Sequence, residues 1–475
     1  MRRHAEELLD SWLNPSNRKP LVIRGARQVG KSTLVRQFAR NHGLDLSEIN
    51  LEKQLYLEPI FKSLDMPRIL RELEGLVGKK IGTENGLLFL DEIQATPSVL
   101  PALRYFYEEF PSLPVIAAGS LLEFSLKDHT FSMPVGRIEY LHLGPMTFSE
   151  FLSALKDDHL LEQMNLYKPE DLWPDSLHKK LLHRQREYML TGGMPEAVLE
   201  FVTTNSLTEA QRIHRAILST FIDDFPKYGH PKKDIFRLQN AFRYIPAHVG
   251  EKVKFSAISK DDRSADTKQA LSLLTMAKLI TPIAYSPASG IPLGADSNPA
   301  IFKCLFLDIG LMNTSCGLDW TAINSLSERS LVNEGGLAEQ FIGQHLLYRD
   351  GGITVPELHY WVREGQAENA EVDFIVSEGN WILPIEVKAG KAGTLRSLQQ
   401  FIYQKEPPVA VRFDLNPPSL ADYDHVIRVG NNIHPITYRM LSLPLYMVGE
   451  LRRIIAILRS SHLLKPYNPQ SHAIF

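Results

Sequence analysis

The chain has 475 residues, 44% hydrophobic and 23% charged, a globular composition that excludes a disordered or fibrous protein. Its formal net charge of -3 excludes a polycation that coats nucleic acid along its whole length, and its two cysteines exclude a disulfide scaffold. No apolar run approaches the ~18 residues that a membrane span needs, so we expect a cytoplasmic protein with no membrane association.

At roughly 150 residues per domain, a chain of this length is expected to form about three domains. Residues 1–155 alternate short apolar strands with helical segments, which is typical of a parallel sheet covered by helices on both faces. We expect an α/β protein with this domain first, a helical region in residues 156–330 and a third, α/β domain in residues 331–475. The expected strands of the first domain are Leu21–Arg24, Ser47–Leu51, Leu87–Leu90, Val115–Ala118 and Glu139–Leu143.

A phosphate-binding loop follows the first of these strands. The segment matches the pattern G-x-x-x-x-G-K-[ST] and lies between a strand and a helical pattern, as this motif requires. Its glycines let backbone N–H groups point at phosphate oxygens, its lysine attracts the β- and γ-phosphates, and its serine hydroxyl is a ligand for Mg²⁺. The alternative is a glycine turn before a surface helix. The residues predicted to bind ATP are Gly25, Ala26, Arg27, Gln28, Val29, Gly30, Lys31, Ser32 and Thr33.

Two carboxylates end the apolar strand Leu87–Leu90. An all-apolar strand is typical of the centre of a parallel sheet, and ligands of such sheets bind beyond the carboxyl ends of the strands. Asp91 is therefore predicted to hold Mg²⁺ through water, and Glu92 to polarise the water that attacks the phosphate. The alternative is an ordinary acidic pair at the start of a helix.

Two further side chains are expected near the same edge of the sheet. Ser120 follows the strand Val115–Ala118, where a hydroxyl would face the γ-phosphate, although it could equally cap a helix. Arg137 precedes the fifth strand and offers a cation that stabilises charge on the transferred phosphoryl group. The sequence leaves open whether Arg137 acts in its own subunit or on a neighbour.

These motifs together resemble a prokaryotic family of AAA-type ATPases that is related to the archaeal and signal-transduction ATPase branch. The resemblance implies a P-loop AAA-type sheet, then a helical lid with a winged-helix-like module, then a C-terminal domain of undescribed function. It also implies ATP hydrolysis, with ATP and Mg²⁺ as cofactors. The segments that carry it are Gly25–Ser32, Asp91–Glu92, Ala118–Ser120, Gly136–Arg137, Leu143–Phe151 and Thr191–Glu196.

The middle of the chain is compatible with a winged helix. Residues Ala265–Leu279 have the periodicity of a helix, and the strands Ile280–Tyr285 and Ile301–Leu307 could pair as a wing around a loop rich in proline and glycine. A winged helix would indicate contact with DNA, but the candidate recognition helix is not notably basic. The alternative is a structural linker that packs on the ATPase domain.

A hairpin in the C-terminal region brings together two carboxylates and a lysine. The segments Glu371–Val376 and Trp381–Lys388 alternate as strands do and are joined by a turn. Glu386 and Lys388 then share one face, and Asp373 comes next to Glu386 across the hairpin. Like charges at close range are costly unless a cation such as Mg²⁺ or Mn²⁺ lies between them. Such a metal would orient water for attack on a phosphodiester, with Lys388 polarising that water.

This hairpin resembles the PD-(D/E)XK nuclease fold, including its archaeal Holliday-junction resolvase type. Asp373 matches the aspartate, and Glu386 with Lys388 matches the E-x-K; Val372 stands in place of the proline. Glu339 matches the acidic residue of the first helix. The resemblance implies Glu339, Asp373 and Glu386 as metal ligands and Lys388 as a catalytic residue. One alternative is a surface hairpin held by an Asp373–Lys388 ion pair, and another is a nuclease-like fold that only binds nucleic acid or a partner.

The sequence thus favours an enzyme that hydrolyses ATP and couples its nucleotide state to a DNA-directed, nuclease-like domain. The alternative is a signalling or interaction ATPase, a switch whose C-terminal domain binds a protein partner without cleavage. An oligomer is compatible with either function.

Overall fold

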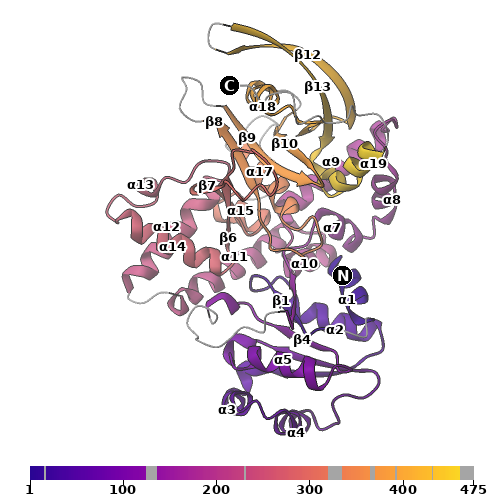
Figure 1. Cartoon of the computed structure of the whole chain (residues 1–475), viewed down its shortest axis with the longest axis vertical. Helices are drawn as coiled ribbons and strands as arrows, with labels where there is room; N and C mark the ends of the chain where they lie inside the picture. The colour runs from indigo at the N-terminus through magenta and orange to yellow at the C-terminus, as the bar shows by residue number, and fades with distance from the viewer. Residues whose placement is uncertain are drawn as a thin grey trace.

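The structure is a computed structural model that describes residues 1–14, 18–124, 136–228, 232–318, 334–363, 370–390, 393–429 and 432–460. The N-terminal sheet, in indigo and purple, lies at the opposite end of the molecule from the orange and yellow C-terminal sheet, with the helices of the middle region between and beside them (Figure 1). Among the described residues, no helix combines the length and the apolar character needed to cross a membrane.

The N-terminal sheet has five parallel strands in the order β2-β3-β4-β1-β5, which confirms the predicted parallel sheet. Successive residues of a strand face opposite sides of the sheet. Leu21 and Ile23 therefore belong to one hydrophobic core and Val22 to the other, so β1 is buried on both faces. The strands are β1 (Leu21–Arg24), β2 (Asp45–Asn50), β3 (Gly86–Asp91), β4 (Val115–Ala118) and β5 (Glu139–His142).

Helices cover both faces of this sheet. On one face, α1 and α2 contribute Leu9 and Phe38 to the first core. On the other face, α3, α4 and α5 contribute Phe61, Leu73 and Phe106 to the second core. These helices are α1 (Ala5–Leu13), α2 (Lys31–Asn41), α3 (Glu58–Lys62), α4 (Met66–Val77) and α5 (Val99–Glu109).

The middle of the chain is helical, as predicted, and begins at α7 with a capping box. The Thr147 side chain accepts from the backbone N–H of Glu150, and the Glu150 carboxylate accepts from the backbone N–H of Thr147. The first core continues from the N-terminal sheet through these helices to the C-terminal sheet. The helices are α7 (Phe148–Ala154), α8 (Asp158–Leu166), α9 (Asp175–Thr191), α10 (Pro195–Thr204), α11 (Leu207–Asp224), α12 (Lys232–Ala247), α13 (Phe255–Ile258), α14 (Ser264–Met276) and α15 (Ile309–Ser315).

The C-terminal sheet is mixed and has eight strands in the order β12-β13-β11-β10-β9-β8-β6-β7. The strands β6 and β7 pair as predicted, but the wing interpretation was wrong. Ala284 and Tyr285 of β6 pair in parallel with β8, which makes the hairpin one edge of the large sheet. Strands on either side of the predicted boundary at residue 330 therefore share one sheet. The strands are β6 (Ile280–Tyr285), β7 (Asn298–Phe306), β8 (His359–Arg363), β9 (Ala370–Glu378), β10 (Trp381–Val387), β11 (Ala410–Asp414), β12 (Ser419–Val429) and β13 (Asn432–Pro444).

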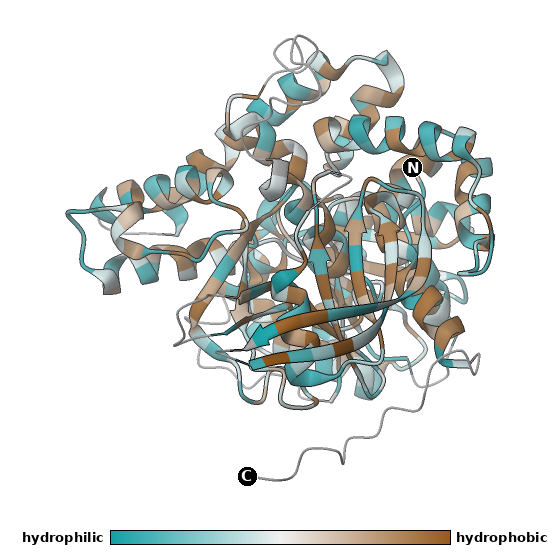
Figure 2. Ribbon diagram, turned by 90° about the horizontal axis from the view of Figure 1, so that it is seen from above, coloured by the Kyte–Doolittle hydropathy of each residue, from teal (hydrophilic) through white to brown (hydrophobic). Residues whose placement is uncertain are grey.

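Two helices cover opposite faces of the C-terminal sheet. On one face, Phe341 of α17 and Phe374 of β9 belong to the first core, and on the other face Phe401 of α18 packs edge-on against Trp361 of β8. Seen from above, apolar and polar residues alternate along the long strands of this sheet (Figure 2). The remaining helices are α17 (Glu334–Leu346), α18 (Arg396–Lys405) and α19 (Leu451–Ser460). The short 3-10 helices are η1 (Leu51–Lys53), η2 (Leu55–Leu57), η3 (Ile93–Ala95), η4 (Phe225–Lys227) and η5 (Leu445–Glu450).

Candidate functional site

The loop of residues 25–32 connects β1 to α2 in a conformation that only glycine tolerates at two positions. Gly25 has φ +152°, and a Cβ there would collide with the carbonyl oxygen of Leu143. Gly30 has φ +92° and is the N-cap of α2, and Gln28 also has positive φ. The loop therefore ends at the amino terminus of a helix, where backbone N–H groups are available to bind phosphate.

Lys31 is held inside this loop by its own backbone. The Lys31 ammonium donates to the carbonyl oxygens of Gly25 at 3.1 Å and Ala26 at 2.7 Å. Its side chain is buried, and this burial lowers the pKa of Lys31 to about 8 although Glu92 and Asp91 raise it. A cation placed in this way can neutralise the β- and γ-phosphates of a nucleotide that binds to the loop.

Ser32 and Asp91 meet where β1 and β3 end. The Ser32 hydroxyl donates to Asp91 Oδ2 at 2.7 Å. Burial raises the pKa of Asp91, whereas the bond from Ser32 lowers it, and the net shift is upward. These two oxygens are hard donors of the kind that Mg²⁺ takes, so the residues present fit the predicted Mg²⁺.

Glu92 interrupts the strand immediately after Asp91. Its backbone adopts the left-handed conformation with φ +55°, and its carboxylate accepts a hydrogen bond from Gln94 at 2.5 Å. The structure therefore places both predicted carboxylates beside the loop, with Glu92 held by an amide rather than by a cation.

Ser120 lies next to the loop residue Arg27. Ser120 is buried, and its hydroxyl accepts from Arg27 Nε at 3.4 Å. The Arg27 guanidinium also forms an ion pair with Asp224, a buried residue at the end of α11, and Lys227 approaches the other oxygen of this carboxylate at 2.9 Å. Asp224, which no sequence motif marks, connects the loop to the helical region.

Arg137 lies at the opposite edge of the sheet from the loop. Because β5 runs parallel to β1, Arg137 precedes the amino end of β5, whereas the loop follows the carboxyl end of β1. These edges are separated by the length of a four-residue strand, about 13 Å. The Arg137 guanidinium pairs with Glu108 at 3.2 Å and lies over the ring of Tyr107. The structure does not bring Arg137 to the loop of its own chain, and its action on a neighbouring subunit stays a prediction.

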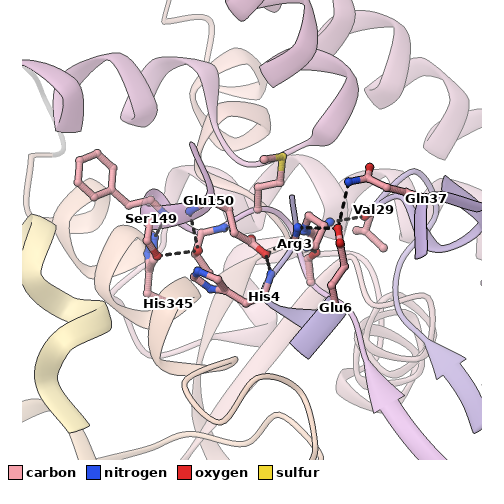
Figure 3. Close-up of polar contacts among 12 residues, drawn as sticks. Arg3, His4, Glu6, Val29, Gln37, Ser149, Glu150 and His345 are labelled. Atoms are coloured by element: carbon pink, nitrogen blue, oxygen red, sulfur yellow. Dashed lines mark hydrogen bonds and ion pairs between the residues drawn. The ribbon is translucent and has the colours of Figure 1, made fainter. Parts of the chain in front are cut away.

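Arg3 connects the loop to the helical region and was not identified from the sequence. Its guanidinium donates to the backbone carbonyl of Val29 in the loop at 2.9 Å and to that of Gly144 at 2.8 Å. It also pairs with Glu150 of α7 at 3.0 Å (Figure 3). Arg3 lies just before α1, whose apolar residues Ala5 and Leu9 are buried, and the only signal in the sequence was a basic residue next to an apolar helix face.

The same network continues to α17. Glu150 Oε1 also accepts from the backbone N–H of His4 at 2.7 Å, and the backbone N–H of Phe148 donates to His345 Nε2 at 2.8 Å (Figure 3). His345 Nδ1 must then carry the proton that it donates to the Phe341 carbonyl at 2.7 Å. Burial lowers the pKa of His345 to about 4, which keeps the ring neutral. Helix α7 is therefore connected to the loop of residues 25–32 through Arg3, and its amino end is hydrogen-bonded to His345 of α17.

The predicted hairpin site forms in the C-terminal sheet. Ile385 pairs with Phe374, so Glu386 comes level with Asp373, whose Oδ2 accepts from the backbone N–H of Val387 at 2.7 Å. The Lys388 ammonium donates to Glu386 Oε1 at 2.6 Å. The ion pair of Lys388 is therefore with Glu386 and not with Asp373. Glu386 Oε2 is buried without a hydrogen-bond partner, and burial raises the pKa of Glu386 to about 8.

A lysine that the sequence analysis missed lies among these carboxylates. Lys303 of β7 is fully buried and pairs with Glu339 at 3.3 Å, with Glu371 and, at 3.9 Å, with Asp373. Burial would lower the pKa of Lys303, but the charges of Glu339, Asp373 and Glu371 outweigh it and raise that pKa. For the carboxyl group of Glu339, burial has the opposite effect and raises the pKa to about 7. A lone lysine in the apolar strand Ile301–Leu307 was the sequence signal for a buried counter-charge.

This cluster is less suited to a metal than the sequence suggested. Within the part of the chain that the structure describes, no group of three or more His, Cys, Asp or Glu side chains is arranged to hold a metal ion. Glu339, Asp373 and Glu386 lie in one region, but an ammonium is inserted between the first two. Metal binding at these residues stays a proposal.

Three segments of the chain match known families. Residues 17–152 match a family described as an AAA domain. These residues form an AAA P-loop ATPase domain. Residues 182–322 and 334–446 match two domains of unknown function, DUF8612 and DUF4143. A P-loop domain of this family indicates hydrolysis of a nucleoside triphosphate, and the two segments that follow it carry no assigned activity.

A curated relative is the replication factor C large subunit of Sulfolobus acidocaldarius, 25% identical over 180 residues. The match covers 34% of this chain and only 39% of that protein. Solved structures with similarity include a Walker-type ATPase of Pyrococcus abyssi, with 16% identity and a TM-score of 0.42 over 66% of this chain and 95% of that one. The ORC2 protein of Aeropyrum pernix has 13% identity and a TM-score of 0.33 over 68% and 94%. The RuvB Holliday junction branch migration motor of Thermotoga maritima has 15% identity and a TM-score of 0.29 over 58% and 88%.

Proposed function

We propose that this protein binds ATP with Mg²⁺ and hydrolyses it at the loop of residues 25–32. The observation that carries the proposal is the 2.7 Å hydrogen bond between Ser32 and Asp91 at the end of the loop. These oxygens would hold Mg²⁺, which neutralises phosphate charge when it is bound. The loop amides would bind the phosphates, and Lys31 would neutralise charge on the phosphoryl group during transfer.

Glu92 is the general base in this proposal. Gln94 fixes its carboxylate, which leaves a second lone-pair direction to accept a proton from the attacking water. Ser120 and Arg27 border the same space and would contact the γ-phosphate. Arg137 would complete the site only from a neighbouring subunit, so the proposal includes an oligomer as the active form.

We further infer that the nucleotide state controls a C-terminal domain that binds a partner without cutting DNA. This proposal is supported by the contact of Arg3 with the loop carbonyl of Val29 and by the contact of α7 with His345. The helix that carries His345 also carries Glu339, which pairs with Lys303 in the C-terminal sheet. A change at the loop therefore has a bonded route to that sheet.

Metal-dependent cleavage of DNA by the C-terminal domain is the second candidate. It is favoured by the placement of Asp373 beside Glu386 and by the 2.6 Å contact of Lys388 with Glu386. In this function, Asp373 and Glu386 would hold Mg²⁺ or Mn²⁺ and Lys388 would polarise water. Similarity to a replication factor C subunit favours DNA as the partner in this case.

The test of the first proposal is calorimetric titration of the full chain with Mg²⁺-ATP. We expect binding in the wild type, loss of binding in Lys31→Ala, and no change in Lys62→Ala, a matched substitution of an exposed lysine on α3. Phosphate release that requires Mg²⁺ would establish hydrolysis. Equal ATP affinity in wild type and Lys31→Ala, at equal melting temperature, would refute the assignment.

A further inference from the structure

The C-terminal carboxylate cluster contains a cation that belongs to the chain itself. The ammonium of Lys303 lies 3.3 Å from Glu339 Oε2 and 3.9 Å from Asp373 Oδ1 and forms a third ion pair with Glu371. We propose that Lys303 is the resident cation of this cluster, and that the native cluster consequently takes no divalent metal ion. This inference rests on the proposed non-cleaving role of the C-terminal domain and gives that role a physical cause.

Charge compensation is the first argument. Carboxylates that converge in a buried place repel one another unless a cation lies between them, which was the reason to expect a metal. Lys303 supplies that cation within 4 Å of Glu339, Asp373 and Glu371. A divalent ion bound to the same oxygens would face a buried ammonium at about the same distance, and at low dielectric that repulsion is large.

The position of the lysine in the sheet is the second argument. Lys303 pairs with Ile283 across the β6–β7 hairpin and forms a backbone bridge with Lys252 on its other side, so its Cα is fixed by the sheet. Its side chain is fully buried, and its ammonium lies 5.3 Å from the centre of the Tyr360 ring. A Cβ added to Gly250 would lie 2.7 Å from Glu339 Oε1, so the backbone after α12 closes over the cluster. A metal ion that displaced the ammonium would leave this charge buried without a carboxylate partner, which costs free energy.

The origin of the lysine is the third argument. Lys303 lies in the segment that matches DUF8612, whereas the carboxylates lie in the segment that matches DUF4143. The cluster is therefore complete only when both segments form one sheet, in which β7 is the edge strand. The cation then serves as an electrostatic contact between the two matched segments.

One carboxylate oxygen of the cluster, Glu386 Oε2, is not hydrogen-bonded to a cation among the described residues. Lys388 occupies Glu386 Oε1, and the buried Glu386 Oε2 has no hydrogen-bond partner. This oxygen is the feature that most favours a metal. A single free acceptor on a carboxylate that already pairs with Lys388 is a poor site for a divalent ion, which needs several oxygen ligands.

The experiment measures the melting temperature of the full chain, without nucleotide, in EDTA and in millimolar Mn²⁺. A cation that binds only the native state raises the melting temperature. Because the proposed wild-type cluster binds no Mn²⁺, we expect Mn²⁺ to shift the melting temperature of the wild type no more than that of Asp373→Asn. We expect Lys303→Met to melt lower in EDTA and to regain about 5 °C or more with Mn²⁺. That gain must disappear when Asp373→Asn is added. Lys252→Met, the neighbouring lysine outside the cluster, is the matched control and should show neither effect.

Saturable Mn²⁺ stabilisation of the wild type that Asp373→Asn or Glu386→Gln removes would overturn the proposal. This result needs no lysine variant, so the proposal stays testable even if Lys303→Met does not fold. A parallel assay of linear and branched DNA separates the two inferences. Cleavage in EDTA that depends on Lys388 would refute the non-cleaving role and leave Lys303 as the resident cation. Mn²⁺ binding without cleavage would refute the resident cation and leave the non-cleaving role.

Discussion

Glu92 is the residue at which binding and hydrolysis of ATP can be separated. In Glu92→Gln, the side-chain oxygen can still accept from Gln94, but the amide cannot take a proton from water. We expect unchanged affinity for Mg²⁺-ATP and a turnover lower by ~10²-fold or more. Calorimetry and phosphate release measure the two quantities, and Glu84→Gln, an exposed residue before β3, is the matched control. Wild-type turnover in Glu92→Gln would mean that another group activates the water.

The residues that sequence reasoning found and those that it missed differ in how far their partners lie along the chain. The loop and the Asp91–Glu92 pair follow strands whose pattern is local, so the sequence predicts their position at one sheet edge. Arg3 pairs with a residue 147 positions away and Arg27 with one 197 positions away. No local pattern encodes such pairs. Arg137 was misplaced for a different reason: it precedes the fifth strand, and the amino ends of parallel strands lie at the sheet edge opposite the loop that follows β1.

At the scale of elements, the ion pair of Arg27 with Asp224 fastens α11 to the loop. Asp224→Asn removes the charge that holds Arg27 and leaves both Arg27 and Lys227 without a carboxylate. Hydrogen bonds to charged groups contribute about 1.5–3 kcal/mol, and both cations can reach solvent, so we expect a loss of about 1–2 kcal/mol in the free energy of unfolding. Denaturant unfolding measures this loss. Asp223→Asn, the exposed neighbour, should change nothing, and equal losses in both variants would contradict the assigned contact.

The contact between α7 and α17 should make stability depend on pH. His345 is neutral in the fold with a pKa of about 4, against an ordinary value of about 6.5, because it is buried. A lowered pKa stabilises the fold above pH 6.5, and the stability is lost as the pH falls from 6.5 to 4. The loss is at most about 3 kcal/mol for such a shift. The groups facing this ring are Glu150, the Tyr188 ring, the Phe148 backbone N–H and the Phe341 carbonyl.

The pH effect is measured as the free energy of unfolding at pH 7 and at pH 4.5. We expect the difference between the two values to be smaller in His345→Gln than in the wild type. His159→Gln, an exposed histidine on α8, should keep the wild-type difference. Protonation of other buried histidines also destabilises the fold in acid. The contribution of His345 is therefore given by the comparison between the variants. An unchanged difference in His345→Gln would show that this ring does not control acid stability.

The elements themselves were largely predictable, and their sheet partners were not. The strands of the N-terminal sheet follow from short apolar runs that begin and end near their observed bounds. The pairing of β6 with β7 also followed, because a hairpin is a local structure. The partner of β6 on its other side is β8, which lies more than 70 residues further along the chain. The wing was therefore inferred from a hairpin whose second neighbour could not be read from the sequence.

At the scale of the whole molecule, one hydrophobic core joins the two sheets. It contains Ile23 of the ATPase sheet, Tyr188 of the middle helices and Phe341 and Phe374 of the C-terminal part. Because protein interiors are close-packed and transmit strain, a displacement at the loop can reach the C-terminal sheet through this core. The polar network of Figure 3 runs beside this core from the loop to α17. The coupling of ATP to the C-terminal domain is therefore expected to depend on rigid contacts rather than on a free linker.

Arg3 is the place to test this coupling, because it is the residue that bonds the loop carbonyl of Val29 and the α7 carboxylate of Glu150 at once. Arg3→Gln keeps a donor but removes the charge, which leaves the buried Glu150 uncompensated. We expect a loss of about 3 kcal/mol in the free energy of unfolding, as for other broken buried pairs. We also expect ATP to slow hydrogen exchange of the α17 amides in the wild type and to lose this effect in Arg3→Gln while binding is retained.

Arg2→Gln is the matched control for this test, since Arg2 is exposed and pairs only at the surface with Glu7. It should keep both the stability and the exchange response of the wild type. If Arg3→Gln binds ATP and α17 still responds as in the wild type, the network is structural and the signal takes another route. A spatial connection alone does not establish coupling. The exchange response of the variant therefore decides whether the network transmits the nucleotide state or only stabilises the fold.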